Sequence, residues 1–241
     1  MTFRQLEWGL LGVWAAVLVS AFAYGKYNAD RTRHDVRSLL MATSALLVVM
    51  AALFWQAGAR GTPLSAFSLL VSLGMAASFV GDLILAEYIR TPQRVIFGIL
   101  AFGVAHVAYI GGLLSAAGAL DGGLDAAGWA IVGGLVVLGV VLWRAIVQSA
   151  KAPAALNYAS LGYTGLISAM TGLGVALALA EPRLWPLALG TVLFFASDAI
   201  LGNQILRKHN WFLVNDVVWV LYISGQALIV WSNRVALNLP G

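Results

Sequence analysis

Cysteine is absent from the 241 residues, and charged side chains are scarce. Without cysteine, the chain has neither a disulfide framework nor a thiolate metal site. Only 10% of the residues are Asp, Glu, Lys or Arg, whereas a soluble domain carries about 25%. Hydrophobic residues make up 61% of the chain, and the mean hydropathy is +0.89. This composition excludes an ordinary soluble domain and indicates a membrane protein.

Several signals of soluble enzymes and binding proteins are also missing. The three histidines show neither H-x-x-x-H nor H-E-x-x-H spacing, so we expect no metal, and no other cofactor is indicated. Neither a Gly-x-Ser-x-Gly sequence nor a Walker-type loop occurs, which leaves no case for a serine hydrolase or an NTPase. The net charge of +4 comes without a basic patch interleaved with aromatics, so we expect no nucleic-acid partner.

Long apolar runs dominate the chain instead. Eight can be marked, near residues 8–25, 37–57, 64–86, 93–115, 127–148, 155–180, 183–206 and 212–233. Links such as Thr62-Pro63, Asp121-Gly122-Gly123 and Glu181-Pro182 separate them. A helix needs roughly 20 apolar residues to cross a bilayer, and a transmembrane barrel would alternate in polarity. We therefore predict an all-α polytopic membrane protein, with residues 1–241 forming one domain of eight transmembrane helices.

The first run also resembles a cleaved signal peptide, because Ala21-Phe22-Ala23 follows its apolar core. We favour a retained first helix. Alternate links differ in the number of basic residues. The links after runs one, three, five and seven, counted with the adjoining ends of the runs, hold ten Lys and Arg residues. The opposite side holds four: Arg4, Arg60, Arg183 and Arg234. The positive-inside rule places the richer side in the cytoplasm. We thus expect a multi-pass protein of the cell (inner) membrane with both termini outside the cytoplasm.

Two stretches of the chain are similar to each other. The third run contains FVGDLIL with Asp82, and the seventh contains FFASDAIL with Asp198. Tyr109-Ile110-Gly111-Gly112 follows the first stretch, and Tyr222-Ile223-Ser224-Gly225 follows the second. These echoes suggest a four-helix unit repeated once, with its halves parallel about an axis normal to the membrane. Short matches of this kind also arise by chance in Gly-rich apolar sequence.

Ionisable groups within hydrocarbon need a partner or a purpose, because a central Asp costs roughly 2.5–3.5 kcal/mol on the insertion scale. At 1.5 Å per residue, Asp82 and Asp216 lie about 6 Å and Asp198 about 12 Å from the cytoplasmic face. Near them, His106 shares a helical face with Tyr109, and Tyr222 shares one with Gln226. A stripe of Asn, Ser, Thr and Tyr residues, Tyr163 among them, runs along the sixth run. We expect these groups to line a wet cavity that opens toward the cytoplasmic leaflet.

Structural interpretations compete with a functional one at each position. Asp82 would be explained by an ion pair with Arg90 or Arg94, and Asp216 by a solvated helix cap, the interpretation we favour for it. A buried histidine such as His106 often only hydrogen-bonds a neighbouring helix, and the Ser and Thr residues of the sixth run suit helix packing. Two whole-protein alternatives also stand: a proton-coupled transporter of small molecules or lipids, and a noncatalytic lipid-binding or assembly protein.

Taken in order along the chain, these residues resemble a known family. Gly81-Asp82, Ala105-His106-x-x-Tyr109, Ser197-Asp198 and Tyr222-x-x-x-Gln226 look like the signature of the lysoplasmalogenase family, also called YhhN-type membrane proteins. The resemblance extends from about Arg37 to Ser232. It implies hydrolysis of the vinyl ether bond of a lysoplasmalogen, a lysophospholipid, to a fatty aldehyde and a glycerophospho-alcohol.

The buried carboxyl groups suit that reaction. Hydrolysis of a vinyl ether needs an acid that protonates the β-carbon and water that captures the oxocarbenium ion, so one protonated and one ionised carboxyl form a natural pair. We predict that Asp82 and Asp198 are this acid/base pair, without assigning which is which. His106, Tyr109, Ser197, Tyr222 and Gln226 are predicted to hold water or substrate. The lipid phosphate is expected to meet four basic residues, Arg90, Arg94, Arg207 and Lys208.

Overall fold

The structure is a computed structural model that describes residues 3–119 and 123–237. Its long helices are α1 (Phe3–Tyr24), α2 (Arg37–Leu53), α3 (Ser65–Leu85), α4 (Arg94–Ala119), α5 (Ala126–Leu142), α6 (Ala154–Ala180), α7 (Trp185–Arg207) and α8 (Val214–Leu237). Wider π-helical turns extend α2 to Ala59 and α5 to Val147, and a short 3-10 turn, Pro182–Leu184, precedes α7. In these described ranges, eight helices are long and apolar enough to cross a membrane. The predicted all-α, eight-helix fold is therefore confirmed, although Asp121 and Gly122 of one predicted break lie outside the described residues.

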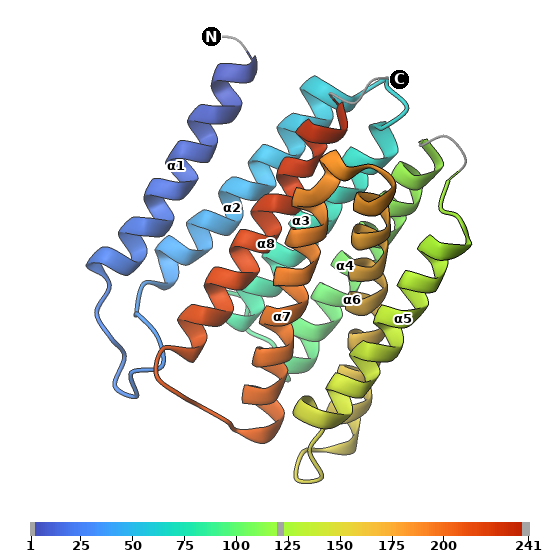
Figure 1. Cartoon of the computed structure of the whole chain (residues 1–241). Coiled ribbons are helices and arrows are strands. Elements are labelled where there is room, and N and C mark those ends of the chain that lie inside the picture. The colour runs from blue at the N-terminus through green and yellow to red at the C-terminus, as the bar shows by residue number, and fades with distance from the viewer. Residues whose placement is uncertain (1–2, 120–122, 238–241) are drawn as a thin grey trace.

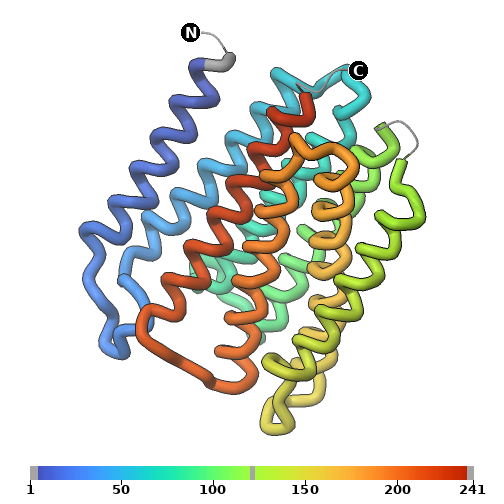
Figure 2. The backbone as a smooth tube through the Cα atoms, viewed as in Figure 1, coloured from blue at the N-terminus to red at the C-terminus, as the bar shows by residue number. Residues whose placement is uncertain are grey.

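The helices run up and down in one bundle, so that alternate links gather at opposite ends (Figure 1). The start of α1 and the end of α8 lie at the same end of the bundle (Figure 2). At the other end are the links 25–36, 86–93, 148–153 and 208–213, and we call this end the basic face because the Lys- and Arg-rich links belong to it. Which side of a membrane the basic face occupies stays a prediction.

Glycines bring α3 and α4 close together, and this contact places two aromatic rings. A Cβ atom at Gly74 would lie 2.6 Å from the ring of Tyr109, and one at Gly81 would lie 2.7 Å from the ring of Phe102. Small residues of this kind let transmembrane helices approach where no hydrophobic driving force exists between them. The sequence of α3 therefore fixes where α4 presents Tyr109 and Phe102.

The packing order of the first four helices matches that of the last four. Consecutive helices pack on one another within each half, α4 also packs on α6, and α8 correspondingly packs on α2. Residues 73–85 and 189–201 share Leu-Gly at the start, Phe and Asp within, and Ile-Leu at the end. These relations are what a four-helix unit repeated once would give, and the repeat itself stays a prediction.

The α1–α2 link folds onto the start of α8 and explains Asp216. This carboxylate is only 6% exposed, and it accepts hydrogen bonds from the backbone N–H of His34 (3.0 Å) and contacts its ring Nδ1 (2.7 Å). The backbone N–H groups of Leu213 and Asn215 donate to carbonyls of the same link. The interpretation of Asp216 as a solvated cap was therefore wrong, because a loop from the far end of the sequence covers it.

Candidate active site

Asp82 lies at the meeting point of three helices. The carboxyl group, 4% exposed, is near the end of α3. Its Oδ2 accepts hydrogen bonds from the hydroxyl of Ser44 on α2 (2.5 Å) and from the hydroxyl of Tyr222 on α8 (2.9 Å). Arg94, one of the proposed ion-pair partners, pairs with Glu87 instead. Asp82 is thus held by buried hydroxyl groups, which is an arrangement that satisfies a carboxylate without a cation.

A chain of hydrogen bonds leads away from Asp82 through α8 to α4. The side-chain amide of Gln226 donates to the hydroxyl of Tyr222 (3.3 Å), and the hydroxyl of Tyr109 donates to Oε1 of Gln226 (2.7 Å). All three side chains are buried. Each donor in this chain has an acceptor. The hydroxyl oxygen of Tyr222 accepts a hydrogen bond from the amide of Gln226, so the hydroxyl proton is free to be donated to Asp82.

Asp198 anchors a second hydrogen-bond chain. Its Oδ2 is hydrogen-bonded to the hydroxyl of Tyr163 on α6. The same hydroxyl lies 2.8 Å from Nε2 of His106 on α4. The other ring nitrogen of His106, Nδ1, lies 3.3 Å from Sδ of Met170, which follows Tyr163 on α6. His106 therefore does bond a neighbouring helix, as the structural interpretation proposed. It also connects that helix to Asp198.

An aromatic cluster lies between the two hydrogen-bond chains. The ring centroid of Phe102 is 5.8 Å from that of Tyr222 and 6.4 Å from that of Phe194. Phe194 in turn is 4.9 Å from the ring of His106. Apolar rings thus contact both hydrogen-bond chains, that of the buried Asp82 and that of the partly buried Asp198.

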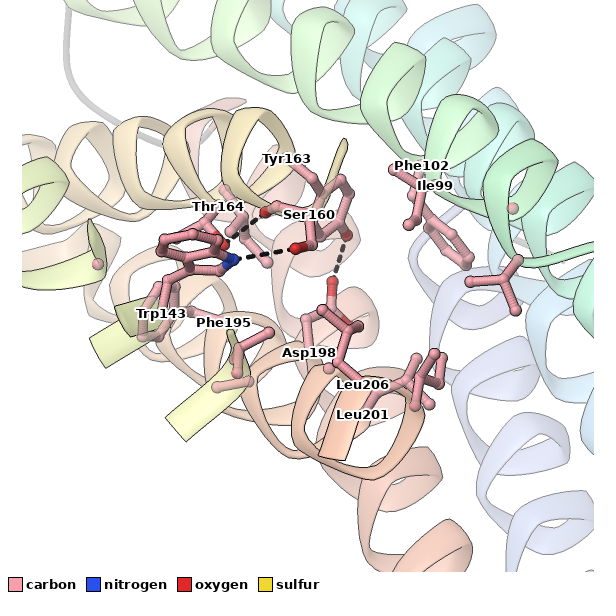
Figure 3. A pocket seen from close by; sticks show the side chains of 18 of the residues that line it. Ile99, Phe102, Trp143, Ser160, Tyr163, Thr164, Phe195, Asp198, Leu201 and Leu206 are labelled. Carbon is pink, nitrogen blue, oxygen red and sulfur yellow. Dashed lines mark hydrogen bonds between the residues drawn. The ribbon is translucent and has the colours of Figure 1, made fainter. Parts of the chain in front are cut away.

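Only one of the two carboxyl groups faces the main pocket. The pocket lies between α4, α5, α6 and α7 toward the basic face, and its cavity volume is about 80 Å³. Asp198 and Tyr163 lie on one side, and Phe102 and Ile99 lie across from them (Figure 3). The other residues that were expected to share a wet cavity with Asp198 do not line this largely apolar pocket: Asp82, His106, Tyr109, Tyr222 and Gln226. Most of the remaining lining is aliphatic or aromatic, which suits a hydrocarbon chain.

Two hydroxyl groups on the pocket wall are already engaged. The hydroxyl of Ser160 accepts a hydrogen bond of 2.9 Å from the indole N–H of Trp143 and also donates to the carbonyl of Asn157. The hydroxyl of Thr164 donates to the carbonyl of Ser160. As expected for packing residues, the hydroxyl groups of Ser160 and Thr164 form hydrogen bonds within the protein. Asp198, with Tyr163 beside it, is the ionisable group on this wall.

The residues predicted for the site divide into three groups. Asp82, Tyr109, Tyr222 and Gln226 form the first chain described above, and Asp198 and His106 form part of the second. The hydroxyl of Ser197 donates to the backbone carbonyl of Val218 (3.0 Å) and is buried there. Sequence reasoning named Tyr163 only as part of the polar stripe of the sixth run and did not name Ser44, although these two side chains touch the two carboxyl groups. Ser44 follows Thr43 in an apolar run and gave no signal of its own.

The basic residues predicted to meet a phosphate also differ in their surroundings. Arg90 and Arg94 line a hollow on the basic face together with Arg37. The hollow adjoins the main pocket at the corner of α3 and α4, where consecutive residues line one and then the other. Arg207 instead donates hydrogen bonds to the backbone carbonyls of Gln148 and Arg144, at the end of the π-helical turns that extend α5.

Comparison with known proteins gives a family. The sequence model of the YhhN family matches residues 36–233, from just before α2 to near the end of α8. Searches of curated proteins and of solved structures found no match. Among the described residues, no three His, Cys, Asp or Glu side chains are grouped as a metal site would require. The chain belongs to the YhhN family, which is the family of the lysoplasmalogenases.

Proposed function

We propose that this protein is a membrane-embedded hydrolase that cleaves the vinyl ether bond of lysoplasmalogens. The observation that carries the proposal is Asp198, a carboxyl group on the wall of an otherwise largely apolar pocket. The hydrogen-bond chain of a second carboxyl group, Asp82, meets that of Asp198 at the rings of Phe102 and Phe194. Family membership supports the same reaction. The products are a fatty aldehyde and a glycerophospho-alcohol, such as glycerophosphoethanolamine or glycerophosphocholine.

The reaction consumes one water and uses an acid followed by a base. A carboxyl O–H gives its proton to the β-carbon of the vinyl ether, whose π electrons form the new C–H bond and leave an oxocarbenium ion. Water adds to the α-carbon and loses a proton to a carboxylate, and the resulting hemiacetal opens to the aldehyde and the free glycerol hydroxyl. Asp82 and Asp198 serve as the acid/base pair, since such a reaction needs one group in each form.

The hydrogen-bonded side chains around the carboxyl groups support them. Tyr222, Gln226 and Tyr109 fix the donor that faces Asp82, and His106 and Tyr163 form the contact to Asp198. Fixed donors and acceptors of this kind act in a dry site without reorganising during the reaction. The alkenyl chain of the substrate occupies the pocket between α4 and α7, beside Phe102 and Leu201.

The phosphate of the head group binds at the hollow formed by Arg37, Arg90 and Arg94. These arginines supply more positive charge than the single Glu87 of the hollow removes, and guanidinium groups bind phosphate through paired hydrogen bonds. Arg207 and Lys208 are not needed for this contact, and Arg207 already has backbone partners. The site then opens toward the cytoplasmic leaflet, provided that the basic face is cytoplasmic.

A comparison of two substrates tests the proposal. Purified protein in detergent is given a lysoplasmalogen and, separately, the matched lysophospholipid with an ester in place of the vinyl ether, and release of aldehyde and fatty acid is followed. We expect aldehyde from the first and little or no fatty acid from the second. Absence of aldehyde, together with proton-coupled uptake by vesicles that contain the protein, would replace the hydrolase with a transporter.

A further inference from the structure

The contact between Met170 and His106 determines which nitrogen of the imidazole carries a proton. Sδ of Met170 lies 3.3 Å from Nδ1, and His106 is fully buried. A thioether sulfur accepts hydrogen bonds but has no proton to donate. If Nδ1 were unprotonated, two lone pairs would face each other in a place that water does not reach. Nδ1 therefore carries the proton.

The position of that proton fixes the next two hydrogen bonds. A neutral imidazole protonated on Nδ1 has an acceptor at Nε2, so the hydroxyl of Tyr163, at 2.8 Å, donates to it. Tyr163 has only one proton, and it is then used. The hydroxyl of Tyr163 is also placed to donate to Oδ2 of Asp198, but its proton is already used for Nε2. The hydrogen bond between Tyr163 and Asp198 is then made by a proton that belongs to Asp198.

Two other proton arrangements are less favourable. In the first, Asp198 is ionised and His106 is neutral. Tyr163 would then donate to Asp198, and Nε2 would carry the imidazole proton and donate to Tyr163. Nδ1 would be unprotonated, with its lone pair facing the sulfur of Met170. If His106 were an imidazolium and Asp198 a carboxylate, the number of protons would be unchanged, but the positive charge would lie on a fully buried ring and would be separated by a tyrosine from a carboxylate that is only partly buried. Separated charges in apolar surroundings cost far more than the neutral arrangement.

Resting on the proposed function, we infer that Asp198 is the neutral acid of the pair, held protonated by a relay of positioning residues, Tyr163, His106 and Met170, and that Asp82 is the carboxylate. Asp82 receives two O–H donors on a single oxygen, from Ser44 and Tyr222, which is the pattern of an ionised acceptor.

The assignment gives a balanced acid step. When the vinyl ether enters the pocket, rotation about the C–O bond of the carboxyl group turns the O–H from Tyr163 to the β-carbon. The O–H bond of Asp198 breaks, the π pair of the alkene forms the C–H bond, and the positive charge resides on the oxocarbenium group. Water then adds and loses one proton to the base of the pair, the Asp82 carboxylate, and the return of a proton to Asp198 restores the resting state. The relay is ready for another turnover.

Nitrogen-15 NMR on the full chain measures the tautomer directly, because only three histidines are present. The His106 signal is identified by its loss in His106→Gln or, if that variant does not fold, by removing His34 and His209 in turn. We expect a neutral ring with a protonated Nδ1 and an unprotonated Nε2. A neutral ring protonated on Nε2, or an imidazolium, would overturn the inference.

Infrared difference spectra test the carboxyl groups themselves. The carbonyl stretch of a neutral carboxylic acid should be present in the resting protein, be lost in Asp198→Asn and remain in Asp82→Asn. A band that survives Asp198→Asn, or one that Asp82→Asn also removes, contradicts the assignment. Neither spectrum requires a substrate, so these results stand whether or not the protein releases aldehyde. Aldehyde release with the wrong tautomer would defeat only the assignment.

Met170→Leu isolates the effect of the sulfur. The substitution keeps a side chain of similar volume and removes the acceptor opposite Nδ1, so we expect the nitrogen-15 shifts of His106 to move. Met75→Leu is the matched control, because Met75 is equally buried and its sulfur contacts Tyr109 rather than His106. Shifts of His106 that are unchanged in Met170→Leu, or that move equally in Met75→Leu, would contradict the role of Met170.

Discussion

The hydroxyl of Tyr222 on α8 donates a 2.9 Å hydrogen bond to Oδ2 of Asp82 on α3, joining residues 140 positions apart in the chain. The amide of Gln226 holds that hydroxyl in place from the other side. One buried contact therefore ties the proposed catalytic carboxylate to the last helix of the bundle. Its loss should be felt both in stability and in activity.

Tyr222→Phe removes this donor while keeping the ring. A hydrogen bond to a charged group contributes about 1.5–3 kcal/mol, and the variant also leaves Gln226 without an acceptor for its amide. We expect a lower melting temperature and at least about a tenfold loss of aldehyde release, in line with the contribution of a positioned acid or base. Tyr158→Phe, at a tyrosine that is 74% exposed, serves as the control and should behave like the parent.

The close approach of α7 and α8 depends on two glycines facing each other. A Cβ atom at Gly190 would lie 2.8 Å from the carbonyl oxygen of Gly225, which is backbone and cannot move aside. We expect Gly190→Ala to destabilise the bundle by about 1–3 kcal/mol, the usual cost of overpacking. Gly162→Ala should be neutral or slightly stabilising, since nothing lies within 4 Å of its Cβ position. Thermal unfolding in one detergent compares the two, and equal melting temperatures would refute this account of the interface.

The link between α1 and α2 is fixed by Asp216. Removing the carboxylate in Asp216→Ala leaves the partly buried backbone N–H of His34 without its acceptor, at a cost of about 1–3 kcal/mol. Asp30→Ala, in the exposed part of the same link, should have little effect. Thermal unfolding measures the change in stability, and limited proteolysis is the second measurement. We expect cleavage within residues 25–36 to accelerate only in the Asp216 variant, and protection as strong as in the parent would show that the link is held by other contacts.

Arg90 should affect the substrate without affecting the fold. Its side chain is exposed in the hollow that we propose for the phosphate, so Arg90→Gln removes a charge from that proposed site. We expect KM for lysoplasmalogen to rise about tenfold, equivalent to roughly 1.4 kcal/mol, with kcat and melting temperature nearly unchanged. Arg183→Gln, near the opposite end of the bundle, is the charge-matched control. A rise in KM that is the same in both variants would contradict the head-group site.

Composition and run length were sufficient to predict the eight helices and the charge difference between the two ends of the bundle. Burial of an apolar run forces the backbone to pair within itself, so the helices follow from the sequence alone. Which side chains meet between helices does not follow from the sequence alone. Nothing near Ser44 in the sequence indicates that its hydroxyl meets Asp82, and nothing near His34 indicates that it covers Asp216. These contacts depend on how the helices pack, which glycines such as Gly74 decide through distances that periodicity does not encode.

The same limit applied to the pocket. Depth along a helix placed Asp82 and Asp198 near one face, but the rotation of each helix decides which carboxyl group faces open space. Phe102, which α4 presents to Gly81, fills the position between them. The sequence therefore predicted the two acidic residues, and the packing of an aromatic ring sets their different surroundings.

The most direct test of the account is aldehyde release from a lysoplasmalogen by Asp198→Asn and Asp82→Asn, with each variant first shown to melt as cooperatively as the parent. Each substitution keeps the shape of the side chain and removes its ability to exchange a proton. We expect both to lose about 10²-fold or more of the activity. Aldehyde release at the parent rate by folded Asp198→Asn would contradict the central claim that this carboxyl group performs the chemistry.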